Sequence, residues 1–304
     1  MDMTISVEGL TKRFGDTLAL DDLTFTVGSG RVTGFVGPNG AGKTTTMRVL
    51  LGLNSPTAGR ALIGGEPYVR MTTPLRQVGA LLDASATHPG RRARDHLLWM
   101  AESNGLSRSR VDVVLELVGL RPVARRRTGS FSLGMAQRLG IAAALLGDPP
   151  VLVLDEPVNG LDPDGIVWIR GFLRSLAAEG RTVFVSSHLM GELEGTADHL
   201  IVIGRGRLLA DTTVDDLLSR MSAGTVTLRT PDAAEAMTVL ANAGGAVSSN
   251  GAGVVTVTGL DAERVGNIAA AHGLRLSELT QDRATLEDAY LRLTRGAAEF
   301  GADR

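Results

Sequence analysis

The first third of the chain alternates short apolar runs with glycine-rich turns, a pattern that predicts β-strands. Between residues 42 and 53 the apolar positions recur at helical spacing instead, directly after a glycine-rich turn. A strand, a turn and a helix in this order are typical of an α/β protein. The strands expected in this part are residues 4–10, 20–27, 31–36 and 77–82, and a further β-rich patch is expected at 59–69.

Residues 92–147 carry the helical period almost throughout, and two apolar runs follow them. These runs are "VLVLDEP" from Val151 and "TVFVSSH" from Thr182. Apolar runs without alternation are typical of parallel strands that are buried on both faces. The helices expected here are residues 93–105, 111–120, 132–147 and 163–180, and the strands that follow are 199–204 and 207–211.

The composition then shifts toward alanine, glycine and threonine. The order strand, helix, strand, helix, strand predicts a small α+β domain, which ends in an amphipathic segment at residues 285–294. We therefore expect a large domain over residues 1–215, with a helical subdomain at about 84–150, and a small α+β domain over 222–304. The elements expected in the small domain are residues 225–230, 233–244, 253–259, 262–273 and 275–280.

Composition narrows the classes of protein to which the chain can belong. Among its 304 residues 43% are hydrophobic and the formal net charge is −2, so no nucleic-acid partner is expected. The chain has no cysteine, which excludes disulfides and thiolate metal sites and fits a reducing cytoplasm. Asp148, Pro149 and Pro150 interrupt its most apolar region, so we expect no membrane-spanning helix. The first 15 residues, "MDMTISVEGLTKRFG", have no apolar core, so we expect no signal peptide.

The segment from Gly37 to Thr44, "GPNGAGKT", fits the phosphate-binding pattern G-x-x-x-x-G-K-[ST]. Glycines let backbone N–H groups approach a polyphosphate, and the following helix directs its positive dipole end at the same anion. Lys43 reaches the β- and γ-phosphates, and the Thr44 hydroxyl is a ligand for Mg²⁺. A chance glycine-rich turn is the alternative, but the required strand and helix flank the segment. The predicted nucleotide-binding residues here are Gly37, Pro38, Asn39, Gly40, Ala41, Gly42, Lys43, Thr44 and Thr45.

Lys43 is one of only two lysines, with Lys12, in a chain that otherwise uses arginine for positive charge. A compact ammonium on a flexible stem serves a phosphate as a point charge. An acid for the metal is expected after the strand that begins at Val151, where Asp155 and Glu156 follow four apolar residues. Asp155 suits the coordination shell of Mg²⁺, and Glu156 suits a base that polarises the attacking water. Because carboxylates often follow strands, this motif is informative mainly through the phosphate loop before it.

With these motifs in place, residues 3–215 resemble the ATP-binding subunit of an ABC transporter. The most specific part is "FSLGM", Phe131 to Met135, which stands where the family has its LSGGQ signature. Ser132 and Gly134 lie at the start of an expected helix, an arrangement that binds phosphate. The resemblance implies that both contact the γ-phosphate of an ATP held by a second subunit. It also implies a P-loop NTPase core with an antiparallel β subdomain and a helical subdomain.

The resemblance implies roles for three further residues. Phe14 resembles the aromatic residue that stacks on adenine, and an ordinary residue of a sheet core is the alternative. Asp162 in "NGLDP" resembles the acid at the nucleotide site that contacts the partner subunit. His188 resembles the histidine that hydrogen-bonds the γ-phosphate and the water, and it completes a predicted catalytic set with Lys43 and Glu156.

One position departs from the family. After the strand expected at 77–82 the family has a glutamine that touches Mg²⁺ and contacts the membrane subunit, whereas this chain has Asp83. A carboxylate binds magnesium but cannot donate an amide hydrogen bond, so Asp83 joins Thr44 and Asp155 as a predicted metal ligand. The acid, the "SLGM" sequence and the appended domain resemble the branch of the family linked to bacitracin and daunorubicin resistance.

The resemblance implies an ATPase that uses ATP and Mg²⁺ and forms an ATP-dependent, head-to-tail homodimer. Its expected partner is a separately encoded membrane permease at the inner face of the cell membrane, and its expected task is export of drug-like or lipid-like compounds. One alternative is a soluble ABC ATPase of DNA repair or translation, against which the single cassette and the lack of cysteine argue. A P-loop kinase or GTPase of another class is the second, against which "FSLGM" before "VLVLDEP" argues.

Overall fold

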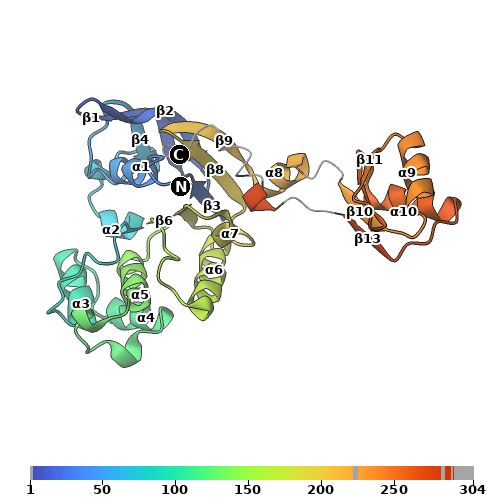
Figure 1. Ribbon diagram of the computed structural model, residues 1–304. Helices are drawn as coiled ribbons and strands as arrows, with labels where there is room; N and C mark the ends of the chain where they lie inside the picture. Colours follow the sequence, from blue (N-terminus) through green and yellow to red (C-terminus); the bar gives the residue numbers. More distant parts are fainter. Residues whose placement is uncertain (1–2, 222–224, 282–284, 289, 291–304) are drawn as a thin grey trace. The chain divides into compact units, whose positions relative to one another are not determined.

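The computed structural model describes residues 3–221, 225–281, 285–288 and 290 (Figure 1). Two compact units make up the chain: the first takes in the described residues up to Thr213 together with Tyr290, and the second takes in the described residues from Val214 to Asp288. Helix α8 (Val214–Met221), which no expected element covered, belongs to the second unit. The division therefore lies slightly before the expected boundary.

A six-stranded sheet forms the centre of the first unit. Its strands in chain order are β3 (Arg31–Val36), β5 (Val78–Leu81), β6 (Val151–Leu154), β7 (Thr182–Ser187), β8 (His199–Gly204) and β9 (Arg207–Thr213). Their order across the sheet is β5-β6-β7-β3-β8-β9, and every pair is parallel except β8 and β9. All residues of β6 and β7 are buried, as their unbroken apolar runs predicted.

A three-stranded antiparallel sheet of order β2-β1-β4 packs on the central one. Its strands are β1 (Ile5–Phe14), β2 (Thr17–Val27) and β4 (Ala58–Ile63). The ring centroid of Phe25 in β2 lies 5.5 Å from that of Phe35 and 5.9 Å from that of Phe184, which join the two sheets in one core. Within the β-rich patch expected at 59–69 the strand ends at Ile63, because Gly64 and Gly65 adopt positive φ there.

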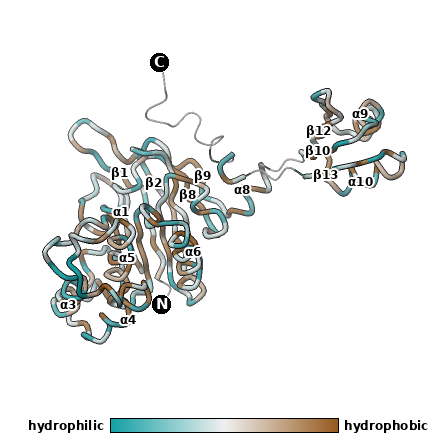
Figure 2. Tube along the Cα trace, turned by 60° about the horizontal axis from the view of Figure 1, so that its bottom comes forward, coloured by the Kyte–Doolittle hydropathy of each residue, from teal (hydrophilic) through white to brown (hydrophobic). Residues whose placement is uncertain are grey.

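Three helices form the helical subdomain, which is labelled α3, α4 and α5 in Figure 1. They are α3 (Ala93–Ser103), α4 (Ser109–Leu117) and α5 (Leu133–Ala144). They pack on one another, and α5 also packs on β5. Figure 2 shows the apolar strands running between α1 and α5 on one side and α6 on the other. The remaining helical elements are α1 (Lys43–Leu50), α2 (Pro74–Gln77), α6 (Pro163–Ala178), α7 (Met190–Leu193), η1 (Tyr68–Arg70), η2 (Arg121–Val123) and η3 (Thr128–Ser130).

Besides α8, the second unit contains a four-stranded antiparallel sheet on which two further helices pack. Its elements are β10 (Val226–Arg229), α9 (Ala233–Asn242), β11 (Ala246–Ser249), β12 (Val254–Thr258), α10 (Ala262–Ala271) and β13 (Glu278–Gln281). The order βαββαβ is that of a ferredoxin-like domain. The expected pattern missed β11, because its sequence "AVSS" has one apolar β-former and only a partly buried side chain there. Residues 289 and 291–294 of the amphipathic segment expected at 285–294 lie outside the described residues.

Candidate functional site

The site lies where three neighbouring parallel strands end. In the central sheet β7 lies between β3 and β6, with Val36 paired to Ser187 and Leu154 paired to Val185. The carboxyl ends of parallel strands meet at one edge of a sheet, where ligands of α/β proteins bind. The segments that follow these ends are the glycine-rich loop 37–42, the pair Asp155 and Glu156, and His188. Pairing of the strands thus joins three motifs that are far apart in the sequence.

The glycine-rich loop is held too closely for side chains at two of its positions. A Cβ on Gly37 would lie 2.5 Å from the carbonyl oxygen of Ile203 in β8. A Cβ on Gly42, whose φ is +107°, would lie 2.6 Å from the Leu20 side chain in β2. Only glycine fits both positions, and α1 begins at the next residue, Lys43. The loop can therefore present its N–H groups and the start of α1 to an anion.

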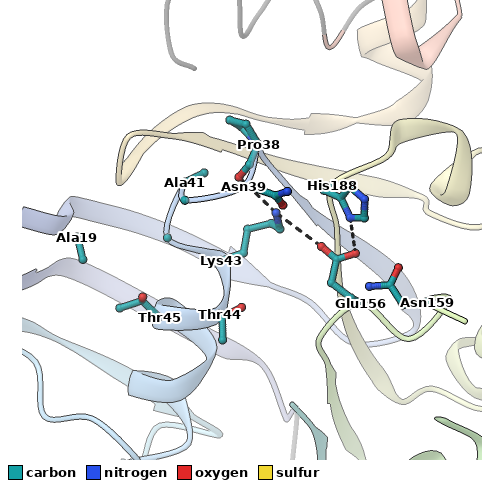
Figure 3. A pocket seen from close by; sticks show the side chains of 12 residues that line it. Ala19, Pro38, Asn39, Ala41, Lys43, Thr44, Thr45, Glu156, Asn159 and His188 are labelled. Atoms are coloured by element: carbon teal, nitrogen blue, oxygen red, sulfur yellow. Dashed lines mark hydrogen bonds and ion pairs between the residues drawn. The ribbon is translucent and has the colours of Figure 1, made fainter. Parts of the chain in front are cut away.

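Lys43 points into this loop and is only 6% exposed (Figure 3). Its Nζ donates to the carbonyl oxygens of Gly37 at 2.7 Å and Pro38 at 3.4 Å, and lies 3.7 Å from Oε1 of Glu156. Burial lowers the pKa of Lys43 below its ordinary value, while the carboxylates of Glu156 and Asp155 oppose the shift. The ammonium is thus largely removed from water. Its attraction for a phosphate is stronger in this less polar environment than it would be in water.

Asp155 is held by two hydroxyl groups. Thr44 Oγ1 donates to its Oδ2 at 2.6 Å, and Ser186 Oγ in β7 donates to its Oδ1. The carboxylate is 8% exposed and its backbone N–H donates to Leu81 of β5 at 2.7 Å. Thr44 and Asp155 are therefore brought together as two hard oxygen donors, although 111 residues separate them.

Glu156 adopts a backbone conformation that is unusual for its residue type. Its φ is +49°, in the left-handed region, which costs a non-glycine residue about 1 kcal/mol. Its carboxylate lies between two basic groups, with Oε2 at 2.8 Å from Nδ1 of His188 and Oε1 near Lys43. Figure 3 shows the three side chains meeting at the mouth of the loop. The predicted catalytic residues are thus in mutual contact.

A pocket of about 420 Å³ lies over the glycine-rich loop. It brings most of the predicted nucleotide-binding residues together with all three predicted catalytic ones. It also contains Ala19 and Asn159, which the motifs did not single out. The lining residues are Ala19, Pro38, Asn39, Gly40, Ala41, Gly42, Lys43, Thr44, Thr45, Glu156, Asn159 and His188.

The signature residues lie apart from this pocket. Ser132 is exposed and caps α5 by accepting a hydrogen bond from the backbone N–H of Met135 at 3.2 Å. It lines a second hollow of about 390 Å³ with Ser85, Thr128 and Phe131, among other residues. A Cβ on Gly134 would lie 2.9 Å from the carbonyl oxygen of Gly160, which explains a glycine in the first turn of α5.

Asp162, Phe14 and Asp83 also lie outside the lining of the nucleotide pocket. Gly37 and Asp155 are not in the lining either, but they contact its residues Lys43 and Thr44. Asp162 is exposed and caps α6, accepting from the backbone N–H of Gly165 at 2.9 Å. Phe14 ends β1 with 49% of its surface exposed, and Nζ of Lys12 lies 4.8 Å from its ring centroid. Asp83 is exposed and accepts from the N–H and the hydroxyl of Ser85, which lower the pKa of its carboxyl.

Two buried residues that the motifs missed hold the backbone of Glu156. Ser186 accepts from its N–H at 2.9 Å, and Nε2 of Gln137 donates to its carbonyl oxygen at 3.0 Å. Only the "SS" before His188 offered a signal for Ser186, and nothing in the local pattern linked Gln137 to a residue 19 positions later.

Families and solved structures that are similar to this chain agree with a nucleotide-binding site. The family described as ABC transporter matches residues 20–159, an AAA domain family matches 125–194, and a domain family of unknown function matches 224–287. A solved ATP-binding subunit of an ABC transporter is similar with a TM-score of 0.65 and 28% identity, over 71% of this chain and 92% of that one. A nucleotide-free ATP-binding cassette is similar in fold, with a TM-score of 0.64, 24% identity and coverage of 73% and 96%. These likenesses confirm the predicted P-loop fold.

Curated relatives extend the comparison. The bacitracin transport ATP-binding protein BcrA of Bacillus licheniformis is 44% identical over 223 residues, which are 72% of this chain and 73% of that protein. The lantibiotic transport ATP-binding protein SrtF of Streptococcus pyogenes is 36% identical over 211 residues, 69% of this chain and 91% of that protein. These relatives are transport proteins, so the alternative of DNA repair or translation is not supported. The predicted family is confirmed: the chain belongs to the ATP-binding, ATP-hydrolysing subunits of ABC transporters.

Proposed function

We propose that two copies of this chain bind two Mg-ATP between them, head to tail, and that hydrolysis drives export through a separately encoded membrane permease. The observation that carries the dimer is the separation of the signature from the nucleotide pocket. Within the described residues, none that lines the pocket comes from α5, yet Ser132 caps α5 with its first turn open to solvent. A two-fold axis would bring this helix end of one copy to the pocket of the other.

In the proposed reaction each side chain of the pocket has one task. Lys43 exchanges its contacts with Gly37, Pro38 and Glu156 for phosphate oxygens. Glu156 accepts a proton from the attacking water, and His188 holds the carboxylate in place. The closed dimer opens when the γ-phosphate contacts are lost, because they are among those that join the two copies.

The residues fit a magnesium ion. Mg²⁺ is usually held by one or two carboxylates or hydroxyls together with phosphate oxygens and water, and Thr44 and Asp155 supply such donors 2.6 Å apart. The ion, when bound, neutralises charge on the β- and γ-phosphates. We propose Asp83 as a further oxygen donor, which requires its bonds to Ser85 to open.

Two residues at the edge of the site are proposed to complete it. Phe14 presents an exposed ring at the end of β1, and we propose that adenine stacks on it. Lys12 already lies over that ring, so a base would have to share or displace it. Asp162 lies exposed at the start of α6, and we propose that it contacts the partner copy.

The exported compounds are proposed from the relatives. Proteins named for bacitracin transport, lantibiotic transport and Nod factor export are 36–44% identical to this chain. We therefore propose that the transporter exports peptide antibiotics or other drug-like and lipid-like compounds. Among the described helices none has the length and apolar character needed to cross a bilayer. We propose that the chain lies at the inner face of the membrane through its permease.

The test of the dimer uses purified Glu156→Gln, which should keep ATP bound without cleaving it. We expect light scattering to give twice the monomer mass with Mg-ATP and the monomer mass without nucleotide. A wild-type turnover that rises with the square of protein concentration at low concentration is the matching kinetic result. A Glu156→Gln variant that hydrolyses ATP at the wild-type rate, or stays monomeric with ATP, would contradict the proposal.

The export proposal has a separate test. The chain should copurify from membranes with a polytopic protein encoded beside it, and the pair should raise the resistance of a sensitive host to a peptide antibiotic such as bacitracin. The matched control is the pair that carries Glu156→Gln, which should give no resistance. Resistance that persists with this variant would show that hydrolysis by this chain does not drive it.

A further inference from the structure

Helix α5 carries two features that face different parts of the molecule. Its N-terminus is capped by the exposed Ser132. One turn further, Gln137 is 4% exposed and its Nε2 donates to the carbonyl oxygen of Glu156 at 3.0 Å. The same helix that presents Ser132 to the outside therefore also contacts the residue whose carboxylate lies in the nucleotide pocket.

The peptide of Glu156 is held from two sides. Its N–H donates to Ser186 of β7, and its carbonyl oxygen accepts from Gln137 of α5. A residue at φ +49° keeps this conformation only while its surroundings enforce it. Because the side chain leaves the backbone at this strained residue, a small rotation of the peptide displaces the carboxylate from His188 and from the water it must meet.

We propose that Gln137 is a positioning residue for Glu156. Through this contact the position of the Glu156 carboxylate, the base of its own site, depends on the position of helix α5. This rests on the proposed function, in which the Ser132 end of α5 binds the ATP held by the partner copy. Seating of α5 on that ATP then fixes the Glu156 peptide in its own copy. Each nucleotide thus influences hydrolysis of the other without any direct contact between the two.

The neighbour of Gln137 shows that α5 is anchored in a separate way. Arg138 donates to the carbonyl oxygen of Val118 at 3.1 Å, and its guanidinium lies 4.3 Å from the ring centroid of Trp168. These contacts tie α5 to α4 and α6. No contact described for Arg138 involves Glu156, so Arg138→Lys is a matched control for general loosening of the helix.

The first experiment compares Gln137→Leu and Gln137→Glu, which remove the donor at similar size, with Arg138→Lys. We expect kcat of both Gln137 variants to fall about 10- to 100-fold, since a misplaced group near the reacting atoms costs about that much. Their KM for ATP should stay within about twofold of the wild-type value. An unchanged melting temperature and unchanged ATP binding show that a variant is folded. If Gln137→Leu does not fold, Gln137→Glu alone is compared with the wild type. An equal loss of kcat in Arg138→Lys, or an unchanged kcat in the Gln137 variants, would overturn the proposal.

The second experiment separates an effect on the copy's own Glu156 from an effect on the partner's nucleotide. Two differently tagged copies are combined so that one carries Glu156→Gln and only the other can hydrolyse. We expect Gln137→Leu to lower turnover when it lies in the copy with the intact Glu156, and not when it lies in the other. The reverse result would place the effect at the partner's site and overturn the proposal. Full activity of Glu156→Gln itself would instead reject the proposed function.

Discussion

Nδ1 of His188 lies 2.8 Å from Oε2 of Glu156, although the two residues follow different strands of the sheet. The other oxygen of this carboxylate lies 3.7 Å from Nζ of Lys43. One acid is thus flanked by two basic groups, one from each neighbouring loop. The arrangement keeps the carboxylate oriented before nucleotide binds, and each of the three groups can be tested alone.

His188→Ala should lower kcat by about 10²- to 10³-fold, within the range for loss of a group that supports acid–base catalysis. The affinity for ATP should change little, because Lys43 and the loop amides are untouched. Steady-state turnover and equilibrium ATP binding measure the two effects. His272→Ala is the control, since His272 is exposed in the second unit and should leave both unchanged. A large loss of ATP affinity in His188→Ala would contradict this reading.

The buried Lys43 should give the nucleotide-free protein a pH-dependent stability. Its pKa is lowered on folding, so between that folded value and the ordinary lysine pKa of 10.5 the unfolded chain binds more protons. The free energy of unfolding should therefore rise with pH across this window relative to Lys43→Met, which also loses ATP binding. Urea unfolding of both proteins between about pH 7 and pH 10 measures the difference. A difference that falls with rising pH would have the wrong sign.

Removal of the Thr44 hydroxyl should weaken the response to magnesium. In Thr44→Ala the Mg²⁺ concentration for half-maximal turnover should rise about tenfold, which corresponds to about 1.4 kcal/mol. Thr44→Ser keeps the hydroxyl and should remain within about twofold of the wild type, because it preserves the donor to Asp155. Titration of turnover with Mg²⁺ at fixed ATP gives the values. Equal magnesium responses in the Ala and Ser variants would argue against Thr44 as a ligand.

Phe14→Ala should raise KM for ATP about fivefold, because stacking of a base on an aromatic ring contributes about 1 kcal/mol. The value of kcat should be retained, since Phe14 lies outside the lining of the pocket that holds Glu156 and His188. Phe14→Tyr keeps the ring and should restore KM. If Phe14→Ala instead lowers melting without changing KM, the residue serves the β1–β2 sheet alone.

The roles of single residues at this site follow from local patterns to different degrees. The loop 37–44 was recognisable because its glycines, lysine and threonine stand close together in the order of one phosphate-binding pattern. Asp155 and Glu156 needed the loop as context, and His188 needed the family resemblance. Asn159 lines the pocket but was not predicted, because the segment "NGLDP" that it begins indicated a role for Asp162 alone.

The fold was predictable where the hydrophobic pattern was strong. The buried strands β6 and β7 and the helices α5 and α6 lie where their apolar periods place them. The pattern failed at β11 and after Ile63, where few apolar side chains are buried and glycine conformation decides the path of the chain.

The sequence by itself determined the phosphate loop, the acids after β6 and the buried strands that carry them, because each depends on residues adjacent in the chain. Only the tertiary structure decided which strand lies beside which, and so which carboxylate oxygen meets Lys43, Thr44 or His188. It also decided that Gln137 reaches the peptide of Glu156. Contacts of this kind depend on strand order and helix packing over long separations, and no local spacing encodes them.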